Sequence, residues 1–297
     1  SYENGVEYVP VKVQPMETGV AAVPRFQKDT TDRNRTSPFA FTGNKFEFRM
    51  LGSASSISGP NTVMNTIVAD AISYIADELE KADDVTAKAK ELIRDLATKH
   101  KRIIFNGNNY SDEWVREAES RGLLNLKNTA DAVPHLVDEK NITLFTKHGI
   151  YTAEELHSRC EILLYNYCMV LHIEALTMLD MSKKEIIPAV SAYLKDLSAT
   201  SSSINSVVAD ADCTMQEQLI HKIAALSGSL YKKTEALSTA VLNTKDHEEN
   251  IEERAQYYKN YIFSGMQELR AVADELETLV GEEYWPFPTY GDLLFKI

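Results

Sequence analysis

The 297-residue sequence carries 31 Lys and Arg residues against 44 Asp and Glu residues, which gives a formal net charge of −13. Such an acidic total argues against nucleic acid or an anionic membrane surface as the main partner. The apolar fraction of 44% is typical of a globular protein, so the chain can bury a sizeable core.

Residues 1–57 differ in composition from the rest of the chain. Short apolar pieces between prolines and glycines predict extended segments and turns. The stretch NKFEFR, residues 44–49, predicts a strand with Phe46 and Phe48 on one face. Ser-Gly-Pro at 58–60 then predicts the start of a helix, and the chain reads as largely helical from there.

Apolar periodicity predicts a series of helices joined by short links. A Ser-rich stretch at 199–206 predicts a flexible joint. After it, two long apolar rows predict an antiparallel hairpin with a coiled-coil-like seam, interrupted in its first helix by Lys233. The expected helices are about 61–82, 86–104, 112–121, 131–147, 153–181, a helix through Pro188 that ends near Ser198, 212–243 and 247–280.

The predicted fold class is therefore mainly α, with N-terminal strands followed by a helical array that ends in a long antiparallel helical hairpin. We expect three regions: 1–57, 58–198 and 207–297. The three cysteines, Cys160, Cys168 and Cys213, have no C-x-x-C spacing, which favours inert thiols in a reducing compartment. With no signal peptide and no apolar run of membrane-spanning length visible, we expect a cytoplasmic protein without a membrane partner.

Several chemistries have no support in the sequence. It contains no HExxH, GxxxxGK[ST], GxSxG or paired CxxC motif, so the sequence does not support a zincin, a P-loop protein, an α/β-hydrolase or a zinc ribbon. His157 and Glu161 lie one helical turn apart, but this spacing is more typical of a solvated helix face than of a metal site. FNGNN at 105–109 is more typical of a turn than of a phosphate-binding loop.

The charged face of the predicted strand is a candidate binding site. Alternate residues on one face of a strand lie roughly 6.5–7 Å apart, so Lys45, Glu47 and Arg49 could hold a phosphate, a divalent metal and a carboxylate in a row. Arg33 and Arg35 lie just upstream and could add donors to a phosphoryl group. The alternative is an amphipathic strand whose charges face water or pair with a neighbour.

The sequence around this strand resembles the C-terminal catalytic segment of glutamine synthetases, specifically the long type III form. The resemblance covers about residue 25 to the C-terminus, and its main blocks are DTTDRNRTSPFAFTGNKFEFRMLGSASSISGPNTVMNTIVAD (29–70), HKRIIFNGNNYSDEWVREAESRGLLNL (100–126), EKNITLFTKHGIYTAEELHSRCEILLYNYC (139–168), IEALTMLDMSKKEIIPAVSAY (173–193) and the ending WPFPTYGDLLF. The resemblance implies that the N-terminal strands belong to an incomplete catalytic β-sheet.

The resemblance also implies the reaction and the partners. Enzymes of this family use ATP to phosphorylate the side-chain carboxylate of glutamate, and ammonia then displaces phosphate from γ-glutamyl phosphate. Two or more Mg²⁺ or Mn²⁺ ions organise the phosphates. Intact type III enzymes are homo-oligomers of stacked hexameric rings, and the helical C-terminal region resembles the part that holds the rings together.

The family's short metal-ligand motif falls on Glu47 and Arg49. By resemblance, Glu47 is a metal ligand and Arg49 holds glutamate and its acyl phosphate. Arg35 matches a phosphate-binding arginine in the RTSP turn. Lys45 is a second-rank candidate because lysine keeps the charge but loses bidentate geometry, and Arg33 is second-rank because its match to a second family arginine stays open. The family's other ligands lie in sequence upstream of this motif, so we expect the chain alone to lack a complete active site.

Two alternatives stay open. One is another carboxylate–amine ligase of the same superfamily. The other is a helical oligomerisation module without chemistry of its own, which would be favoured if Glu47 and Arg49 paired with each other on an open surface.

Overall fold

The structure, a computed structural model, describes residues 15–16, 26–27, 35–42, 45–49, 52, 56–247, 249–288 and 290–295. The chain forms two compact units, the first within 1–126 and 143–152 and the second within 127–142 and 153–297. Helices account for most of the described residues, which confirms the predicted mainly-α class. The three regions predicted from the sequence stay a prediction.

The first unit contains two antiparallel strand pairs, β1 with β2 and β3 with β4. Its strands are β1 (Pro15–Met16), β2 (Phe26–Gln27), β3 (Phe39–Phe41) and β4 (Phe46–Phe48). Its helices are α1 (Ser58–Glu80), α2 (Val85–Lys99), the 3₁₀ helix η2 (Lys101–Ile103) and α3 (Asp112–Ser120), with the C-terminal part of α5 (Glu139–Lys147).

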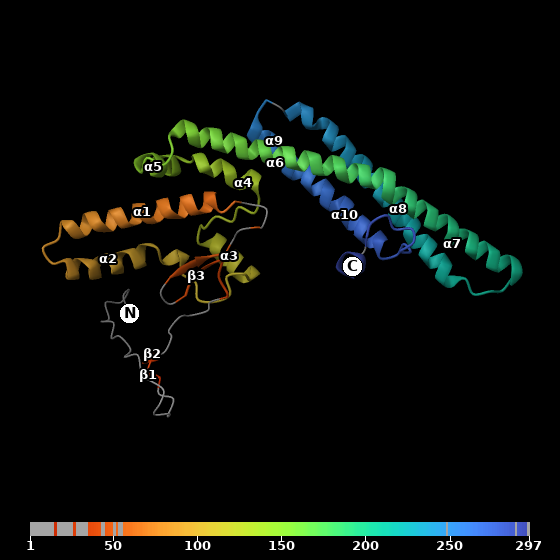
Figure 1. Cartoon of the computed structure of the whole chain (residues 1–297), viewed down its shortest axis with the longest axis horizontal. Helices are drawn as coiled ribbons and strands as arrows, with labels where there is room; N and C mark the ends of the chain where they lie inside the picture. The colour runs from red at the N-terminus through yellow and green to blue at the C-terminus, as the bar shows by residue number, and fades with distance from the viewer. Residues whose placement is uncertain are drawn as a thin grey trace. The chain divides into compact units, whose positions relative to one another are not determined.

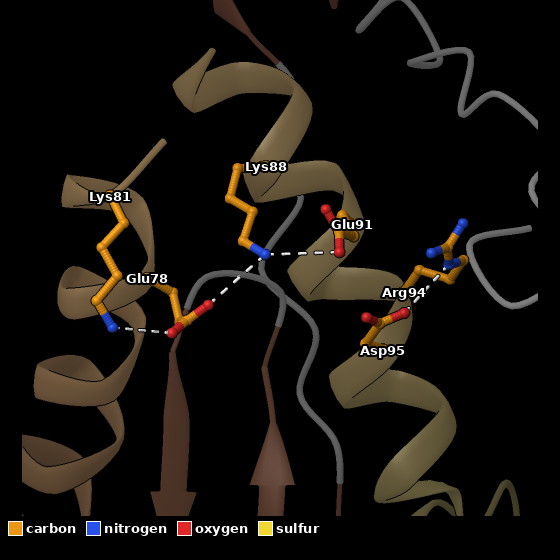
Figure 2. Close-up of polar contacts among 6 residues, drawn as sticks. All are labelled: Glu78, Lys81, Lys88, Glu91, Arg94 and Asp95. Carbon is orange, nitrogen blue, oxygen red and sulfur yellow. Dashed lines mark hydrogen bonds and ion pairs between the residues drawn. The ribbon is translucent and has the colours of Figure 1, made fainter. Parts of the chain in front are cut away.

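The helices α1 and α2 lie side by side as an antiparallel pair (Figure 1). Their turn is fixed because the side chain of Asp84 caps α2, accepting from the backbone N–H of Ala87 at 3.0 Å. Figure 2 shows the ion pairs of this hairpin, in which Lys88 Nζ reaches Glu78 on α1 at 3.6 Å and Glu91 on α2 at 3.5 Å. Lys88 therefore links the two helices.

Some of the large apolar side chains of α1 lie on its exposed side. Ile67 and Tyr74 are about half exposed, and Thr66 is the buried residue of the helix. On another side of α1, Asp70 accepts hydrogen bonds from Lys147 at 2.7 Å and from His148 Nε2 at 3.0 Å. These hydrogen bonds, led by that from Lys147, lower the pKa of Asp70 and attach the end of α5 to α1.

The regular elements in the described part of the second unit are all helices. Its helices are α4 (Thr129–Ala132), η3 (Val133–Val137), α6 (Ala153–Met181), the π-helix η4 (Ser182–Ile186), α7 (Ile187–Val207), α8 (Thr214–Leu242), η5 (Asn243–His247), α9 (Ile251–Tyr257), the π-helix η6 (Tyr258–Phe263), α10 (Ser264–Glu277) and α11 (Tyr290–Phe295). The helix expected over 131–147 is interrupted, because Pro134 lacks an N–H and Asp138 adopts an extended conformation.

The helices α6, η4 and α7 form one continuous run (Figure 1). Pro188 has no N–H to donate to the preceding turn, and the adjacent Ile187 N–H bonds the more distant Ser182 carbonyl, so the turn before the proline is a π-turn. The predicted helix end near Ser198 is wrong. The helix continues to Val207, so the flexible joint expected at 199–206 is wrong as well. The polar side chains of this stretch bond backbone carbonyls of their own helix, as Thr200 does to Asp196 at 2.8 Å.

This long helix is apolar enough over one 18-residue window, by length and composition, to match a membrane span, although no such run was expected from the sequence. One face of α6 is packed in the core of the second unit through Cys160, Leu164, Leu171 and Ala175. Another face leaves large apolar side chains exposed. The exposed residues are Ile162, Tyr165, Met169, Ile173 and Leu176.

The predicted hairpin seam is confirmed between α8 and the run α9–η6–α10. Fully buried residues of the first row include Ile223, Leu230 and Leu237, and those of the second include Ala255, Tyr258, Ile262, Leu269 and Leu276. Where Lys233 interrupts the row, Thr234 takes the buried position, and a 2.7 Å hydrogen bond joins its hydroxyl to Ser182 Oγ. Lys233 itself pairs with Glu268 across the hairpin.

Candidate functional site

The candidate site lies on the β3–β4 hairpin. The two strands pair antiparallel with Ala40 opposite Glu47 and Phe39 opposite Phe48. The predicted alternation is confirmed, because the phenylalanines pack against one another on one face. The Phe39 and Phe46 rings are stacked with centroids 5.1 Å apart, and the Phe41 and Phe46 rings are tilted with centroids 5.2 Å apart. The charged side chains of β4 therefore share the opposite face with Ala40.

The three predicted charges on this face are in contact. Glu47 Oε2 accepts hydrogen bonds from Arg49 Nη2 at 2.6 Å and from Arg49 Nε at 3.2 Å, and Lys45 Nζ lies 3.7 Å from Glu47 Oε1. The hydrogen bond from Arg49, followed by the positive charges of Arg49 and Lys45, holds the pKa of Glu47 below its ordinary value. Glu47 is therefore an anionic carboxylate at neutral pH.

The local fold explains why these side chains share one row. Thr42 is buried and closes the hairpin through its backbone N–H and hydroxyl, which both donate to the Lys45 carbonyl, at 2.8 Å and 3.1 Å. At the other end of the pair, Arg49 N–H donates to the Pro38 carbonyl at 2.8 Å. These bonds fix the register, and the register places Lys45, Glu47 and Arg49 on the same face.

Arg35 lies just before the hairpin with an exposed side chain, and it has no hydrogen-bond or ion-pair partner within the described part of the chain. The neighbouring Thr36 carbonyl accepts from the backbone N–H of Asn109 at 2.8 Å. The loop 105–109, expected only as a turn, is therefore docked beside Arg35. Nothing in the sequence pattern pointed to this contact, because a backbone hydrogen bond leaves no signature in side-chain spacing. Arg33 lies outside the described residues.

The donor chemistry of this face fits a divalent metal through one ligand. Glu47 offers hard carboxylate oxygens of the kind that Mg²⁺ and Mn²⁺ prefer. Among residues 35–42, 45–49 and the other described ranges, no group of three or more His, Cys, Asp and Glu side chains gathers at one point. The roles expected for Arg35, Lys45, Glu47 and Arg49 stay predictions.

The face opposite the charged row is unusual for a water-exposed surface. Phe39, Phe41, Phe46 and Phe48 are between 45% and 62% exposed. Contiguous exposed aromatic rings mark surfaces that contact other protein more often than surfaces that face water. The hairpin thus presents one ion-paired face and one apolar face.

Comparison with known proteins places the chain among relatives of one kind. Residues 88–205 match the glutamine synthetase C-terminal domain. The chain is 44% identical over 283 residues to a glutamine synthetase of Butyrivibrio fibrisolvens and 37% identical over 290 residues to a type-3 glutamine synthetase of Dictyostelium discoideum. These alignments cover 92% and 94% of this chain but 39% of each relative, so the chain spans about two fifths of the length of the curated relatives it matches.

Proposed function

The chain belongs to the glutamine synthetase family, and from this premise we propose that it forms the C-terminal part of a type III glutamine synthetase and one wall of its active site. The proposal is carried by the position of Glu47, whose carboxylate lies between Lys45 and Arg49 and is held anionic by them. The chain that contains it aligns with a glutamine synthetase over 92% of its length. The name of the Dictyostelium relative supports the type III assignment.

In the proposed reaction, ATP transfers its γ-phosphoryl group to the side-chain carboxylate of glutamate. Ammonia then attacks the acyl carbon of γ-glutamyl phosphate, and phosphate leaves with the electron pair of the broken C–O bond. Bound Mg²⁺ or Mn²⁺ would neutralise phosphate charge. Glu47 would supply one oxygen ligand, and Arg49 would grip glutamate and its acyl phosphate through its two-pronged guanidinium.

The remaining cations would act on the phosphates. Arg35 is exposed and supports a role in binding the transferring phosphoryl group, whose charge spreads over three oxygens. Lys45, which is more exposed than Arg49, would add a point charge, and Arg33 is a further candidate from the sequence. Lysine cannot reproduce the planar fork of arginine, so Lys45 ranks below Arg35.

The Glu47–Arg49 pair gives the site a way to couple ligands. A metal that takes Glu47 Oε2 competes with the two hydrogen bonds from Arg49. The guanidinium keeps its charge and carries several N–H donors, so the donors displaced from Glu47 could bind an anionic substrate. Metal binding and glutamate binding would therefore favour each other.

We also propose that the 297-residue polypeptide does not synthesise glutamine by itself and works in a larger homo-oligomeric assembly. Three exposed apolar surfaces support this: the phenylalanine face of the hairpin, the face of α1 that carries Ile67 and Tyr74, and the exposed face of α6. Such surfaces are normally covered by other protein. The three free, buried cysteines support a cytoplasmic setting.

A second candidate, a helical oligomerisation module without chemistry, is favoured by one observation. Glu47 and Arg49 pair with each other, with side chains 37% and 30% exposed. That is the arrangement expected if these charges serve only to keep one face of the hairpin soluble.

Calorimetry with Mg·ATP separates the two candidates. We expect the chain to bind Mg·ATP and Glu47→Ala to lose at least about tenfold in affinity, because an anionic ligand disappears. Glu91→Ala is the matched control, since Glu91 is also an exposed, ion-paired carboxylate of the first unit (Figure 2). Equal affinity in all three proteins, or no binding by any, would leave the module as the better account.

A further inference from the structure

The second unit contains a cavity of about 640 Å³ between α6 and α10, under the segment 281–288. Its walls include Met178 and Met181 from α6, Met266 from α10, and Trp285 and Phe287 from the covering segment. This volume lies within the range of roughly 300–1,000 Å³ that small-molecule sites occupy. The cavity has no part in the function proposed above.

The walls suit a flat apolar group. Methionine side chains adapt to the shape of a ligand, and their sulfur atoms make favourable contacts with aromatic rings. Trp285 and Phe287 lie edge to face with ring centroids 6.2 Å apart, so the two rings present surfaces in different directions. The aromatic ring of a ligand can therefore pack against the methionine thioethers and the rings of Trp285 and Phe287 at the same time.

The covering segment carries an unused hydrogen-bond donor. Trp285 Nε1 is buried and has no acceptor within the described part of the chain. The segment is not loose, because Tyr284 Oη donates to Asp196 Oδ2 on α7 at 2.5 Å and the Tyr284 ring packs on Tyr193 at 5.2 Å. Buried donors in native proteins are nearly always paired, so the indole N–H of Trp285 is a candidate donor to a bound ligand.

The rim of the cavity is acidic. Its four charged side chains are Glu174, Asp274, Glu277 and Arg270, and Arg270 is already paired with Asp274 at 3.3 Å. Glu174 and Glu277 have no ion-pair partner among the residues that the structure describes. Two uncompensated carboxylates beside aromatic and thioether walls favour a cationic ligand.

Both π-helices border this cavity. Ser182 and Ile186 belong to η4, and Phe263 belongs to η6. Pro188 explains η4, but the sequence of η6, YKNYIF, contains no proline or glycine. π-Turns are rare and frequently lie at functional sites, and a ligand pocket gives a reason for the second one.

We propose that this cavity binds an arylalkylammonium ion that carries a hydrogen-bond acceptor on its ring. The ring packs among Met178, Met181 and Met266, the acceptor takes the indole N–H of Trp285, and the ammonium group lies at the carboxylates of the rim. The binding stands whether or not the chain belongs to an active ligase.

Three probes of nearly equal size test each part of this assignment. Tyramine has the ring, the ammonium group and a phenol oxygen; tyrosol replaces the ammonium with a hydroxyl; phenethylamine lacks the phenol oxygen. By calorimetry with the full chain, we expect saturable binding of tyramine, about tenfold weaker binding of tyrosol and about threefold weaker binding of phenethylamine. Equal affinities for tyramine and tyrosol would overturn the proposal.

Variants then locate the site. The double variant Glu174→Gln/Glu277→Gln should weaken tyramine about tenfold and leave tyrosol unchanged. Glu161→Gln, an exposed carboxylate of α6 outside the cavity, should change neither. In a Trp114→Phe background, which leaves Trp285 as the remaining tryptophan, tyramine should alter the fluorescence excited at 295 nm. Tyramine binding that none of these changes affects places the ligand elsewhere and refutes the site.

The chain itself offers another occupant. Leu293, Leu294 and Phe295 of α11 are between 67% and 80% exposed and follow the covering segment closely. If the unmodified chain binds no tyramine but the triple variant L293S/L294S/F295S does, the cavity receives the chain's own tail and the ligand proposal is wrong.

Discussion

Replacing Leu237 by alanine tests the seam between α8 and α10. Leu237 is 1% exposed, and the change removes three buried carbon atoms at about 0.8 kcal/mol each. The cavity left behind adds up to about 2 kcal/mol, so we expect a loss of about 2–4 kcal/mol in the free energy of unfolding.

Gly265 lies opposite this side chain, and the sign of its substitution should depend on Leu237. A Cβ at Gly265 would lie 3.3 Å from Leu237 Cδ1. In the unmodified chain, the gain of about 1 kcal/mol from replacing a helical glycine is offset by a similar cost of overpacking. In the Leu237→Ala background that contact disappears and the new methyl fills part of the cavity, so Gly265→Ala should stabilise by about 1–2 kcal/mol.

Urea unfolding, followed by Trp285 fluorescence in the Trp114→Phe background, measures this coupling in the second unit. Gly228→Ala is the matched control, because a Cβ there meets no atom within 4 Å and its effect should be the same in both backgrounds. The m-values must agree between variants for the comparison to hold. A coupling between positions 237 and 265 below about 0.5 kcal/mol would refute the packing argument.

Three further outcomes follow from buried or paired groups. Burial raises the pKa of the Cys168 thiol to about 11 from 9.0. At pH 8 the folded chain should therefore hold about a hundredfold less Cys168 thiolate than the urea-unfolded chain, and a thiol reagent should modify Cys168 correspondingly more slowly. Equal rates of modification in the folded and unfolded chains would contradict this. Hydrogen bonds, chiefly from Lys259, lower the pKa of Asp131, so this carboxylate stabilises the fold above its unfolded pKa and loses that contribution as pH falls through the lower folded value. The stability gap between the chain and Asp131→Asn should therefore shrink from about pH 6 to about pH 3, and a constant gap would be inconsistent. Thr234→Val should lower the free energy of unfolding by about 1–3 kcal/mol, because it leaves the buried Ser182 hydroxyl without its Thr234 partner. The double variant Thr234→Val/Ser182→Ala should regain most of that loss, as measured by urea unfolding.

The long helices were predictable because their cores repeat along the sequence. The expected helix 153–181 coincides with α6, and the seam residues Leu230 and Leu269 are buried as their spacing required. The helix through 199–206 was not predictable from composition, because serine occurs both in loops and in helices where its hydroxyl bonds a carbonyl of the preceding turn. Only the geometry shows that Thr200 bonds the Asp196 carbonyl instead of water.

The candidate site divides in the same way. Strict alternation in KFEFR predicts which side chains share a face, and the hairpin bears this out. The direct pairing of Glu47 with Arg49 was one of two open arrangements, because a spacing of two residues in a strand does not determine side-chain rotamers. The neighbours of Arg35 were not predictable, since the contact with the 105–109 loop runs through backbone atoms.

A chimera tests the central claim most directly. The matched C-terminal segment of the Butyrivibrio fibrisolvens relative is replaced by this chain, and γ-glutamyl hydroxamate formation from glutamate, hydroxylamine and Mg·ATP is measured. We expect a folded chimera to be active, its Glu47→Ala variant to lose about a hundredfold or more, and the 297-residue chain alone to be inactive. Full activity in the Glu47→Ala chimera, or turnover by the chain alone, would contradict the account.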